Sequence, residues 1–239
     1  MRLIVKQPTK VALLDLAMAI NHKKKWNDID KSNIRISLLR EQGFICAYCM
    51  QRIEDDGLKT TIEHWEAQAV LKDTEENNRI FDYNNLLAVC SHKIQPIPHC
   101  DASRSDGNRW LMVNPTNKRT LLPIKFLPNG TIEAVCSCKK PCKKPCKKPI
   151  HEEELCVHCD LTCSKGLNLN TFYLMENRKN EITKIQKQFE VWCKGKTYEQ
   201  ALLVKKKLLA NYLSLKKDGQ NEKRMPYCGA VEYVYRKFL

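Results

Sequence analysis

Apolar positions recur at helical spacing near the start of the chain. The stretch VALLDLAMAI, within residues 1–30, carries a weak helical signal. The stretch that follows, SNIRISLLREQG, predicts a helix from about residue 33 to residue 42. Ser32 is its expected N-cap, and Gly43 suits the position just past its end. The residues expected on its apolar face are Ile34, Leu38 and Leu39.

Helical patterns return in the last third of the chain. TFYLMENRKNEITKIQKQFEVWCK is amphipathic, and YEQALLVKKKLLANYLSLKK predicts a second helix. PYCGAVEYVYRKFL suits either a strand or a short helix. The positions expected to be buried in the first of these helices are Phe172, Leu174, Ile182, Ile185 and Phe189.

Short strands and polar segments alternate in the middle of the chain. TTIEHW predicts a strand, LLAVC is short and apolar, and LKDTEENNRIFDYNN between them is polar loop. HCDASRSDGNRWLMV is expected to open a helix, and LPIKFLPNGTIEAVC predicts a hairpin that turns at Asn129–Gly130. Residues 136–163 repeat Lys-Lys-Pro-Cys, and prolines at this spacing forbid a regular helix. We therefore expect an insertion or loop there rather than core.

These patterns predict an α+β fold in three parts. Residues 1–125 hold the N-terminal helices and a core at about 33–110. Residues 126–169 hold the hairpin and the Cys/Lys-rich insertion, and residues 170–239 form a C-terminal helical region.

Charge narrows the choice of partners. Among 239 residues, lysine and arginine exceed the acids by 41 − 27 = 14, which favours a polyanion, nucleic acid first and an anionic membrane second. No apolar run approaches the ~20 residues that a membrane span needs. MRLIVKQPTK lacks the apolar core of a signal peptide, so we expect a cytoplasmic protein without a membrane partner.

Thirteen cysteines call for an explanation other than disulfides, because a reducing cytoplasm disfavours disulfides and the number is odd. Two well-separated thiolate pairs suit a tetrahedral Zn²⁺ site, in which His92 or His99 could replace one cysteine. Such a zinc is structural, since four protein ligands leave no position for substrate. The alternative is four buried thiols packed as small apolar groups. The four candidate ligands are Cys46, Cys49, Cys90 and Cys100.

An acid and a histidine stand side by side at the end of the strand predicted from TTIEHW. Glu63 and His64 lie between the two cysteine pairs, and Asp101 directly follows the fourth cysteine. If the pairs come together, two carboxylates and a histidine converge. Carboxylates suit Mg²⁺ or Mn²⁺, and a histidine of near-neutral pKa suits proton abstraction from water. The alternative is a solvent-exposed strand end.

The stretches CAYC, IEHW, DYNNLLAVC and HCDASRSD, in this order, resemble the HNH endonucleases. Within that family the chain is most similar to the PtuB branch, the HNH partner of an ATPase in Septu-type and retron-linked anti-phage systems. FLPNGTI and LNLNTFYLMENR also resemble this branch, so the likeness covers most of the chain. The resemblance implies a ββα-metal nuclease core with a zinc-stabilised hairpin.

The resemblance also implies roles for single residues. His64 is implied to be the general base that activates water, and Glu63 to be a ligand of a catalytic Mg²⁺ or Mn²⁺ ion. Asn85 takes the place of the middle asparagine, which orients the histidine through a hydrogen bond, with Asn84 as the alternative.

Two assignments depart from the family pattern or go beyond it. Asp101 stands where many family members have a histidine or asparagine metal ligand, and His99 is the competing candidate. Arg104, one turn further on, is a candidate to stabilise the dianionic transition state, and the alternative is a solvated surface charge.

The PtuB likeness implies a toxic effector of anti-phage defence. Its partners would be an ATPase subunit of the PtuA type and a retron reverse transcriptase with its msDNA. The substrate is DNA or RNA, including tRNA, since a histidine acting on water needs no 2′-hydroxyl. The hypothesis from a different class is a non-catalytic zinc-ribbon adaptor, which would bind nucleic acid without cutting it.

A second group of cysteines admits three interpretations: a second zinc site with His151 and His158 within reach, a flexible basic arm that contacts phosphates, or a repeat expansion without a role. Its members are Cys136, Cys138, Cys142, Cys146, Cys156, Cys159 and Cys163.

Four other residues are single candidates outside these groups. Trp65 is expected to pack rather than stack on a base, and Arg178 to face the active site or form a structural ion pair. Cys193 and Cys228 are expected to be ordinary thiols.

Overall fold

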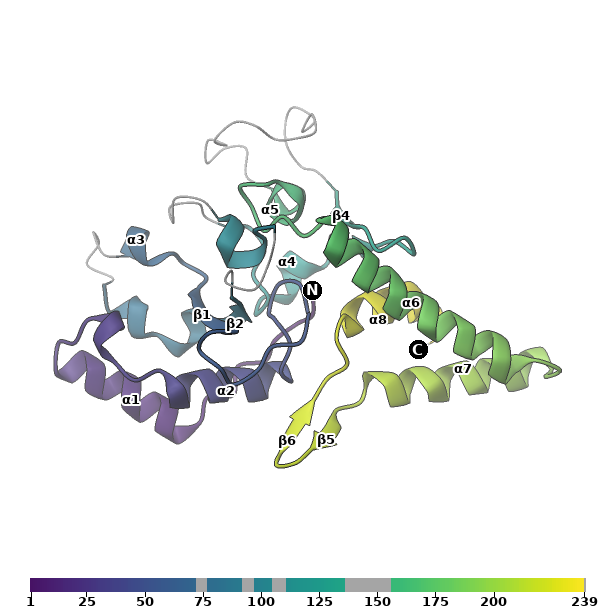
Figure 1. Ribbon diagram of the computed structural model, residues 1–239, viewed down its shortest axis with the longest axis horizontal. Coiled ribbons are helices and arrows are strands. Elements are labelled where there is room, and N and C mark those ends of the chain that lie inside the picture. Colours follow the sequence, from purple (N-terminus) through teal and green to yellow (C-terminus); the bar gives the residue numbers. More distant parts are fainter. Residues whose placement is uncertain (72–76, 92–96, 105–110, 136–155, 239) are drawn as a thin grey trace.

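Helices and small two-stranded sheets make up the chain, which is described here by a computed structural model for residues 1–71, 77–91, 97–104, 111–135 and 156–238 (Figure 1). The α-helices are α1 (Lys10–Asn21), α2 (Ser32–Gln42), α3 (Gln68–Leu71), α4 (Lys118–Leu121), α5 (Val157–Thr162), α6 (Phe172–Cys193), α7 (Tyr198–Leu213) and α8 (Cys228–Tyr235). The strands are β1 (Thr60–His64), β2 (Leu86–Cys90), β3 (Ile124–Phe126), β4 (Ile132–Ala134), β5 (Lys216–Asp218) and β6 (Asn221–Lys223). The 3-10 helices are η1 (Trp26–Asp28), η2 (Asn77–Phe81), η3 (Tyr83–Asn85), η5 (Cys100–Ser103) and η7 (Arg236–Phe238).

The sheet that carries the site is the antiparallel pair β1–β2, in the register Thr60↔Cys90 to His64↔Leu86. Every residue of β2 is buried, because α2 and the N-terminal part of the chain cover this sheet (Figure 1). The predicted strands TTIEHW and LLAVC are thereby confirmed, as is the hairpin β3–β4 with its turn at Asn129–Gly130. Within the described residues, no helix has the length and hydropathy needed to cross a membrane.

Helix α2 follows its prediction closely, with one correction at its start. Ile34, Leu38 and Leu39 are fully buried, and Gly43 ends the helix with φ 67° in the left-handed region. Ser32 is not the N-cap, since Lys31 occupies that position and the main-chain N–H and hydroxyl of Ser32 both donate to Asp30.

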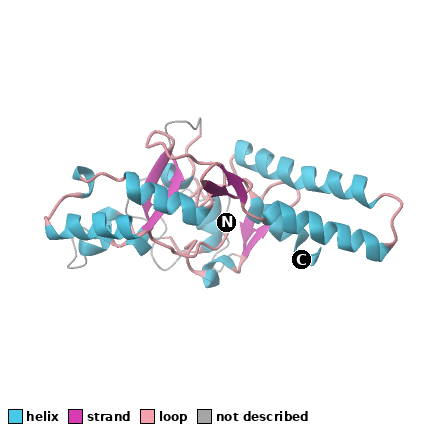
Figure 2. Cartoon of the chain, turned by 90° about the horizontal axis from the view of Figure 1, so that it is seen from below, coloured by secondary structure: helices cyan, strands magenta, loops and turns pink. Residues whose placement is uncertain are grey.

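Helices α6 and α7 form a helical hairpin that extends away from the β1–β2 sheet and opens toward it, with α8 packed against both helices (Figures 1 and 2). Four of the five predicted core positions on α6 are buried, but Phe172 is 73% exposed because, two residues before the fully buried Leu174, it lies on the opposite face of the helix. Helix α7 ends at Leu213, earlier than predicted, and the hairpin β5–β6 follows with Gly219 at its turn. The segment PYCGAVEYVYRKFL is helical, as α8. Cys228 is buried and Cys193 half-buried.

The end of the cysteine-rich segment corrects the prediction of a loop over 136–163. Residues 157–162 form α5, and Cys156, Cys159 and Cys163 are buried. Helix formation is possible because the prolines stop before Cys156, whose Sγ caps the helix by accepting from the N–H of Cys159 at 3.4 Å. The carboxylate of Asp160 then ties α5 to the preceding chain by accepting the N–H groups of Met112 and Val113.

Arg178 on α6 does not line the cavity that holds Glu63 and His64, and it pairs with no acid in the contacts that the structure describes. Its Nε donates to the oxygen of Gly130 at 2.5 Å, and one Nη donates to the oxygen of Leu169 at 2.7 Å and to Oδ1 of Asn170 at 3.3 Å. Burial lowers the pKa of Arg178 to about 10, so the side chain stays charged at neutral pH. It therefore joins the β3–β4 turn to α6.

Replacing Arg178 by methionine is expected to lower the free energy of unfolding by about 3 kcal/mol, because buried carbonyl oxygens lose a charged donor. Urea unfolding followed by circular dichroism measures this change. Lys179→Met, at the exposed neighbouring position, is the control and should change stability by less than about 0.5 kcal/mol. Equal stability of the two variants would contradict this role.

Candidate functional site

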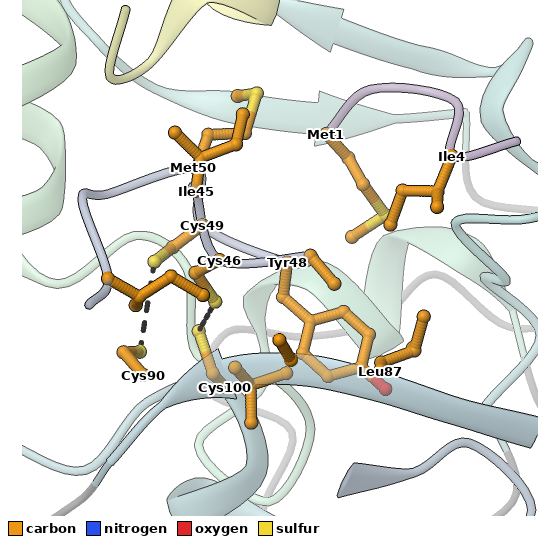
Figure 3. Close-up of a cluster of buried hydrophobic side chains, with 14 of the residues drawn as sticks. Met1, Ile4, Ile45, Cys46, Tyr48, Cys49, Met50, Leu87, Cys90 and Cys100 are labelled. Atoms are coloured by element: carbon orange, nitrogen blue, oxygen red, sulfur yellow. Dashed lines mark hydrogen bonds between the residues drawn. The ribbon is translucent and has the colours of Figure 1, made fainter. Parts of the chain in front are cut away.

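Four buried cysteines lie close enough together to hold a zinc ion (Figure 3). The ligand atoms of Cys46, Cys49, Cys90 and Cys100 all lie within 4.8 Å of one another. The Sγ atoms are 3.8 Å apart in the pair Cys46–Cys100 and 3.9 Å apart in Cys49–Cys90, too far for a disulfide. A tetrahedron with Zn–S bonds of ~2.3 Å has edges of about 3.8 Å. The sulfur positions therefore match zinc coordination.

Local backbone geometry presents the first two thiols of this cluster. The N–H of Met50 bonds to the oxygen of Cys46 at 3.0 Å, which closes a tight turn, and Met50 adopts φ 66°. The N–H of Ala47 bonds to the oxygen of Ala88 at 3.1 Å, so β2 fixes the turn directly. Cys90 then comes from the end of β2, and Cys100 from the start of η5.

The protonation of the cluster favours a cation. Burial alone would raise the pKa of Cys46, but hydrogen bonds from the thiols of Cys100, Cys49 and Cys90 outweigh it and hold that pKa well below its ordinary value. Burial and the Cys46 thiolate raise the pKa of Cys100 well above its ordinary value. A divalent ion bound here would supply the positive charge that favours deprotonation of buried thiols.

His99 belongs to this cluster and not to the acid–histidine pair, which corrects its place as alternative ligand of a catalytic ion. Its Nδ1 lies 3.2 Å from Sγ of Cys100 and 3.8 Å from Sγ of Cys90. Its Nε2 is buried without a hydrogen-bond partner among the described residues. His92, the other candidate replacement for a cysteine, lies outside the described residues.

A separate cavity of about 360 Å³ brings together the acid–histidine pair and the residues after the fourth cysteine. Glu63 and His64 reach it from the end of β1, and Asp101 and Arg104 from η5 and its C-cap. Asp101 is half-buried, while the other three side chains are buried. The solvent-exposed strand end considered above is therefore wrong.

The ring of His64 is held in one orientation. Its Nε2 lies 2.9 Å from the main-chain oxygen of Ile80, which can only accept, so Nε2 carries the proton. Nδ1 then has the lone pair, and Nε2 of Gln68 donates to it at 3.0 Å. The ring of Trp26 packs edge-on against His64, with centroids 4.6 Å apart. Burial lowers the pKa of His64 to about 4, so the ring is neutral at neutral pH.

Asn85 supports His64 through the backbone and not through the ring, which corrects the predicted hydrogen bond. Its Oδ1 accepts from the N–H of Glu66 at 2.8 Å, and its main-chain oxygen accepts from the N–H of Trp65 at 2.9 Å. Both contacts fix the chain just beyond His64. Asn84 is exposed and bonds to Asp82, which removes it as the alternative.

Arg104 is a buried charge and not a solvated one. One Nη contacts the carboxylate of Glu63, and its two terminal nitrogens lie 3.4 Å from the main-chain oxygens of His64 and Trp65. The predicted helix at this point is the single turn η5, which Arg104 ends by donating its N–H to Asp101 at 3.0 Å. Trp65 itself packs as predicted, with Nε1 donating to Val113.

The donors in this cavity fit a hard divalent ion by their chemistry, since Glu63 and Asp101 offer carboxylate oxygens. The ligand atoms in this cavity are farther apart than the sulfur atoms of the four cysteines. Within the described residues, the four cysteines are the only set of three or more acid, histidine or cysteine donors whose ligand atoms lie within 4.8 Å of one another.

The second cysteine group is described only at its C-terminal end. Sγ of Cys156 lies 3.3 Å from Sγ of Cys159, while Nδ1 of His158 accepts from the N–H of Ala134 at 3.4 Å. The other candidate ligands lie outside the described residues, and they are Cys136, Cys138, Cys142, Cys146 and His151.

Three contributors to the site were absent from the sequence prediction. They are the Ile80 oxygen and the side chains of Gln68 and Trp26. Gln68 lies only four residues after His64 and could have been suspected, whereas Trp26 and Ile80 come from segments that carry no motif. Comparison of the chain with protein-family models and with curated proteins gives no match.

Proposed function

We propose that the chain is a metal-dependent HNH endonuclease that hydrolyses phosphodiester bonds in nucleic acid. The observation that carries the proposal is the setting of His64. Its ring is neutral, its Nε2 proton is held by the Ile80 oxygen, and its unprotonated Nδ1 belongs to a side chain that shares a cavity with Glu63 and Asp101. Nδ1 can accept a proton from water; burial makes it a weaker base than an exposed histidine, and the carboxylate of Asp101, which raises the pKa of His64, opposes that effect. The basic excess of 14 charges suits a polyanionic substrate.

Each residue of the cavity then has a part. Nδ1 of His64 takes the proton from the attacking water after Gln68 has turned away. Asn85 keeps the chain beyond His64 in place, and Arg104, which lines the cavity, would contact a phosphate bound there. Glu63 and Asp101 are the residues that would hold Mg²⁺ or Mn²⁺, and such an ion supplies charge stabilisation to the phosphate and the leaving oxygen.

We further propose that the four-cysteine cluster holds a structural zinc. The cluster joins the turn after α2, the end of β2 and the start of η5, and η5 with its C-cap also borders the cavity through Asp101 and Arg104. A zinc there would fix Asp101 and Arg104 relative to β1.

The test is a cleavage assay on the purified chain. Duplex DNA, single-stranded DNA and total RNA are offered with Mg²⁺, with Mn²⁺ and with EDTA. Cutting that depends on the divalent ion is expected, and the cut polymer identifies the substrate.

A role as toxic effector in anti-phage defence is also proposed, with an ATPase subunit of the PtuA type as partner and a retron as regulator. The support for this role is the sequence resemblance to the PtuB branch. Co-expression with such an ATPase, followed by purification of the complex, tests the partnership.

A second zinc site is proposed at Cys156 and Cys159. The two buried sulfurs are 3.3 Å apart, close enough to bind one ion together, and the N–H of Cys159 donates to Sγ of Cys156. The double variant Cys156→Ser/Cys159→Ser is expected to lose one equivalent of zinc and to keep the zinc of the first cluster. Elemental analysis of protein purified without chelator measures both. An unchanged zinc content would contradict this site.

The zinc-ribbon adaptor remains the second candidate, and the four-cysteine cluster is the observation that favours it. An adaptor would bind nucleic acid and leave it intact in every arm of the cleavage assay. It would also be unaffected by loss of the His64 ring.

A further inference from the structure

One contact in the cavity conflicts with the binding of a divalent ion. The guanidinium of Arg104 contacts Oε1 of Glu63, the carboxylate that we assign to the ion. The side chains of this pair are 4% and 8% exposed, so water screens neither charge well. The same guanidinium also lies 3.4 Å from the main-chain oxygens of His64 and Trp65, which fixes it at the end of β1.

The carboxylate of Glu63 cannot bind the Arg104 guanidinium and a divalent ion at full strength at the same time. A guanidinium and a divalent ion at the same carboxylate repel each other, and this repulsion is strong where the effective dielectric constant is low. The carboxylate also needs one of them, because a buried charge without a counter-charge is strongly destabilising. Ion binding and the Arg104 contact are therefore in competition.

We propose that Arg104 neutralises Glu63 in the resting protein and that a phosphate of the nucleic acid draws Arg104 away, so that metal loading is coupled to nucleic-acid binding. A phosphodiester offers the planar guanidinium two oxygens, as a carboxylate does. By linkage, nucleic acid and the ion raise each other's affinity by the same factor. The inference rests on the proposed function, since it takes Glu63 as the metal ligand.

The test measures Mn²⁺ binding from the electron paramagnetic resonance signal of free Mn²⁺, on chain that contains zinc and no nucleic acid. Mn²⁺ prefers oxygen ligands and leaves the thiolate cluster to zinc. Arg104→Met removes the competing charge and is expected to bind Mn²⁺ about tenfold more tightly than the unaltered chain. Arg104→Gln is the second variant and should show the same shift.

Two controls define the site. Arg79→Met breaks a comparable pair, in which Arg79 lies 2.5 Å from Glu66 and neither residue lines the cavity, and its Mn²⁺ affinity should be unchanged. Glu63→Gln should bind Mn²⁺ far more weakly than the unaltered chain, because the ion loses a carboxylate ligand.

The coupling itself is tested in the His64→Ala chain, with short duplex DNA and tRNA as probes that stay intact. At least one probe is expected to tighten Mn²⁺ binding, and neither should do so once Arg104→Met is added. If Arg104→Met and Arg104→Gln bind Mn²⁺ no more tightly than the unaltered chain, this inference is wrong and the nuclease proposal stands. If no chain binds Mn²⁺ under any condition, both are wrong.

Discussion

Replacement of His64 by alanine is expected to slow the cleavage of nucleic acid by about a thousandfold. The reason is the loss of Nδ1, the only atom of the ring that can accept a proton while Nε2 donates to Ile80. The zinc content should stay the same, because the described contacts of the ring are to Ile80, Gln68 and Trp26 and not to the four thiols. Quantitative gel analysis under single-turnover conditions measures the rate.

Controls separate lost chemistry from lost structure. His64 is 3% exposed, so its removal leaves a void, and His64→Gln is the second variant because it fills more of that void and keeps a polar group. His22→Ala, at an exposed position after α1, should cut at the unaltered rate. Added imidazole should restore part of the activity to His64→Ala, since it supplies a base of the same kind.

The contrary outcome is equally informative. If His64→Ala cuts as fast as the unaltered chain, then cutting comes from another group or from a contaminating enzyme. If neither chain cuts any substrate, even with an ATPase partner of the PtuA type present, the adaptor explains the cysteines and the charge better.

Sequence predicted best those parts of the fold that depend on short-range geometry. A CxxC turn, a period of 3.6 residues and an Asn-Gly turn are local rules, and they correctly placed the cysteine turn, α2 and the β3–β4 hairpin. The β5–β6 hairpin was missed because its strands are short, polar and largely exposed, so no alternation marks them. Phe172 was misplaced although the helical period sets it on the face opposite the buried Leu174.

The candidate site was harder to predict, because it is formed by contacts between segments that are distant in the sequence. Adjacent residues such as His99 and Cys100 look interchangeable as ligands in the sequence. The structure places Nδ1 of His99 beside the thiols, where Cys100 turns the chain with φ 56°. The contact of Arg104 with Glu63 joins residues 41 positions apart. Spacing could suggest that these residues meet, but it could not show which group neutralises which.

Loss of the zinc cluster is expected to unfold the N-terminal part of the chain. In Cys46→Ser/Cys49→Ser the two remaining thiols cannot complete a tetrahedral site, so one equivalent of zinc should be lost. Zinc binding is worth about 10–16 kcal/mol in small zinc-dependent domains, which is comparable to the whole stability of a typical domain. The cluster also connects the turn after α2 to β2, so its loss removes support from the buried strand.

Elemental analysis and urea unfolding measure the two halves of this prediction, and chelation of the unaltered chain should reproduce the result. Cys193→Ser is the matched control, since Cys193 is a half-buried thiol on α6 outside the cluster, and it should keep both zinc and stability. If Cys46→Ser/Cys49→Ser binds as much zinc and unfolds at the same urea concentration as the unaltered chain, the four thiols are ordinary core residues. The placement of Asp101 and Arg104 would then depend on packing alone. A nuclease whose cavity depends on zinc should instead lose cleavage and zinc together as chelator is added, with Mg²⁺ kept in excess.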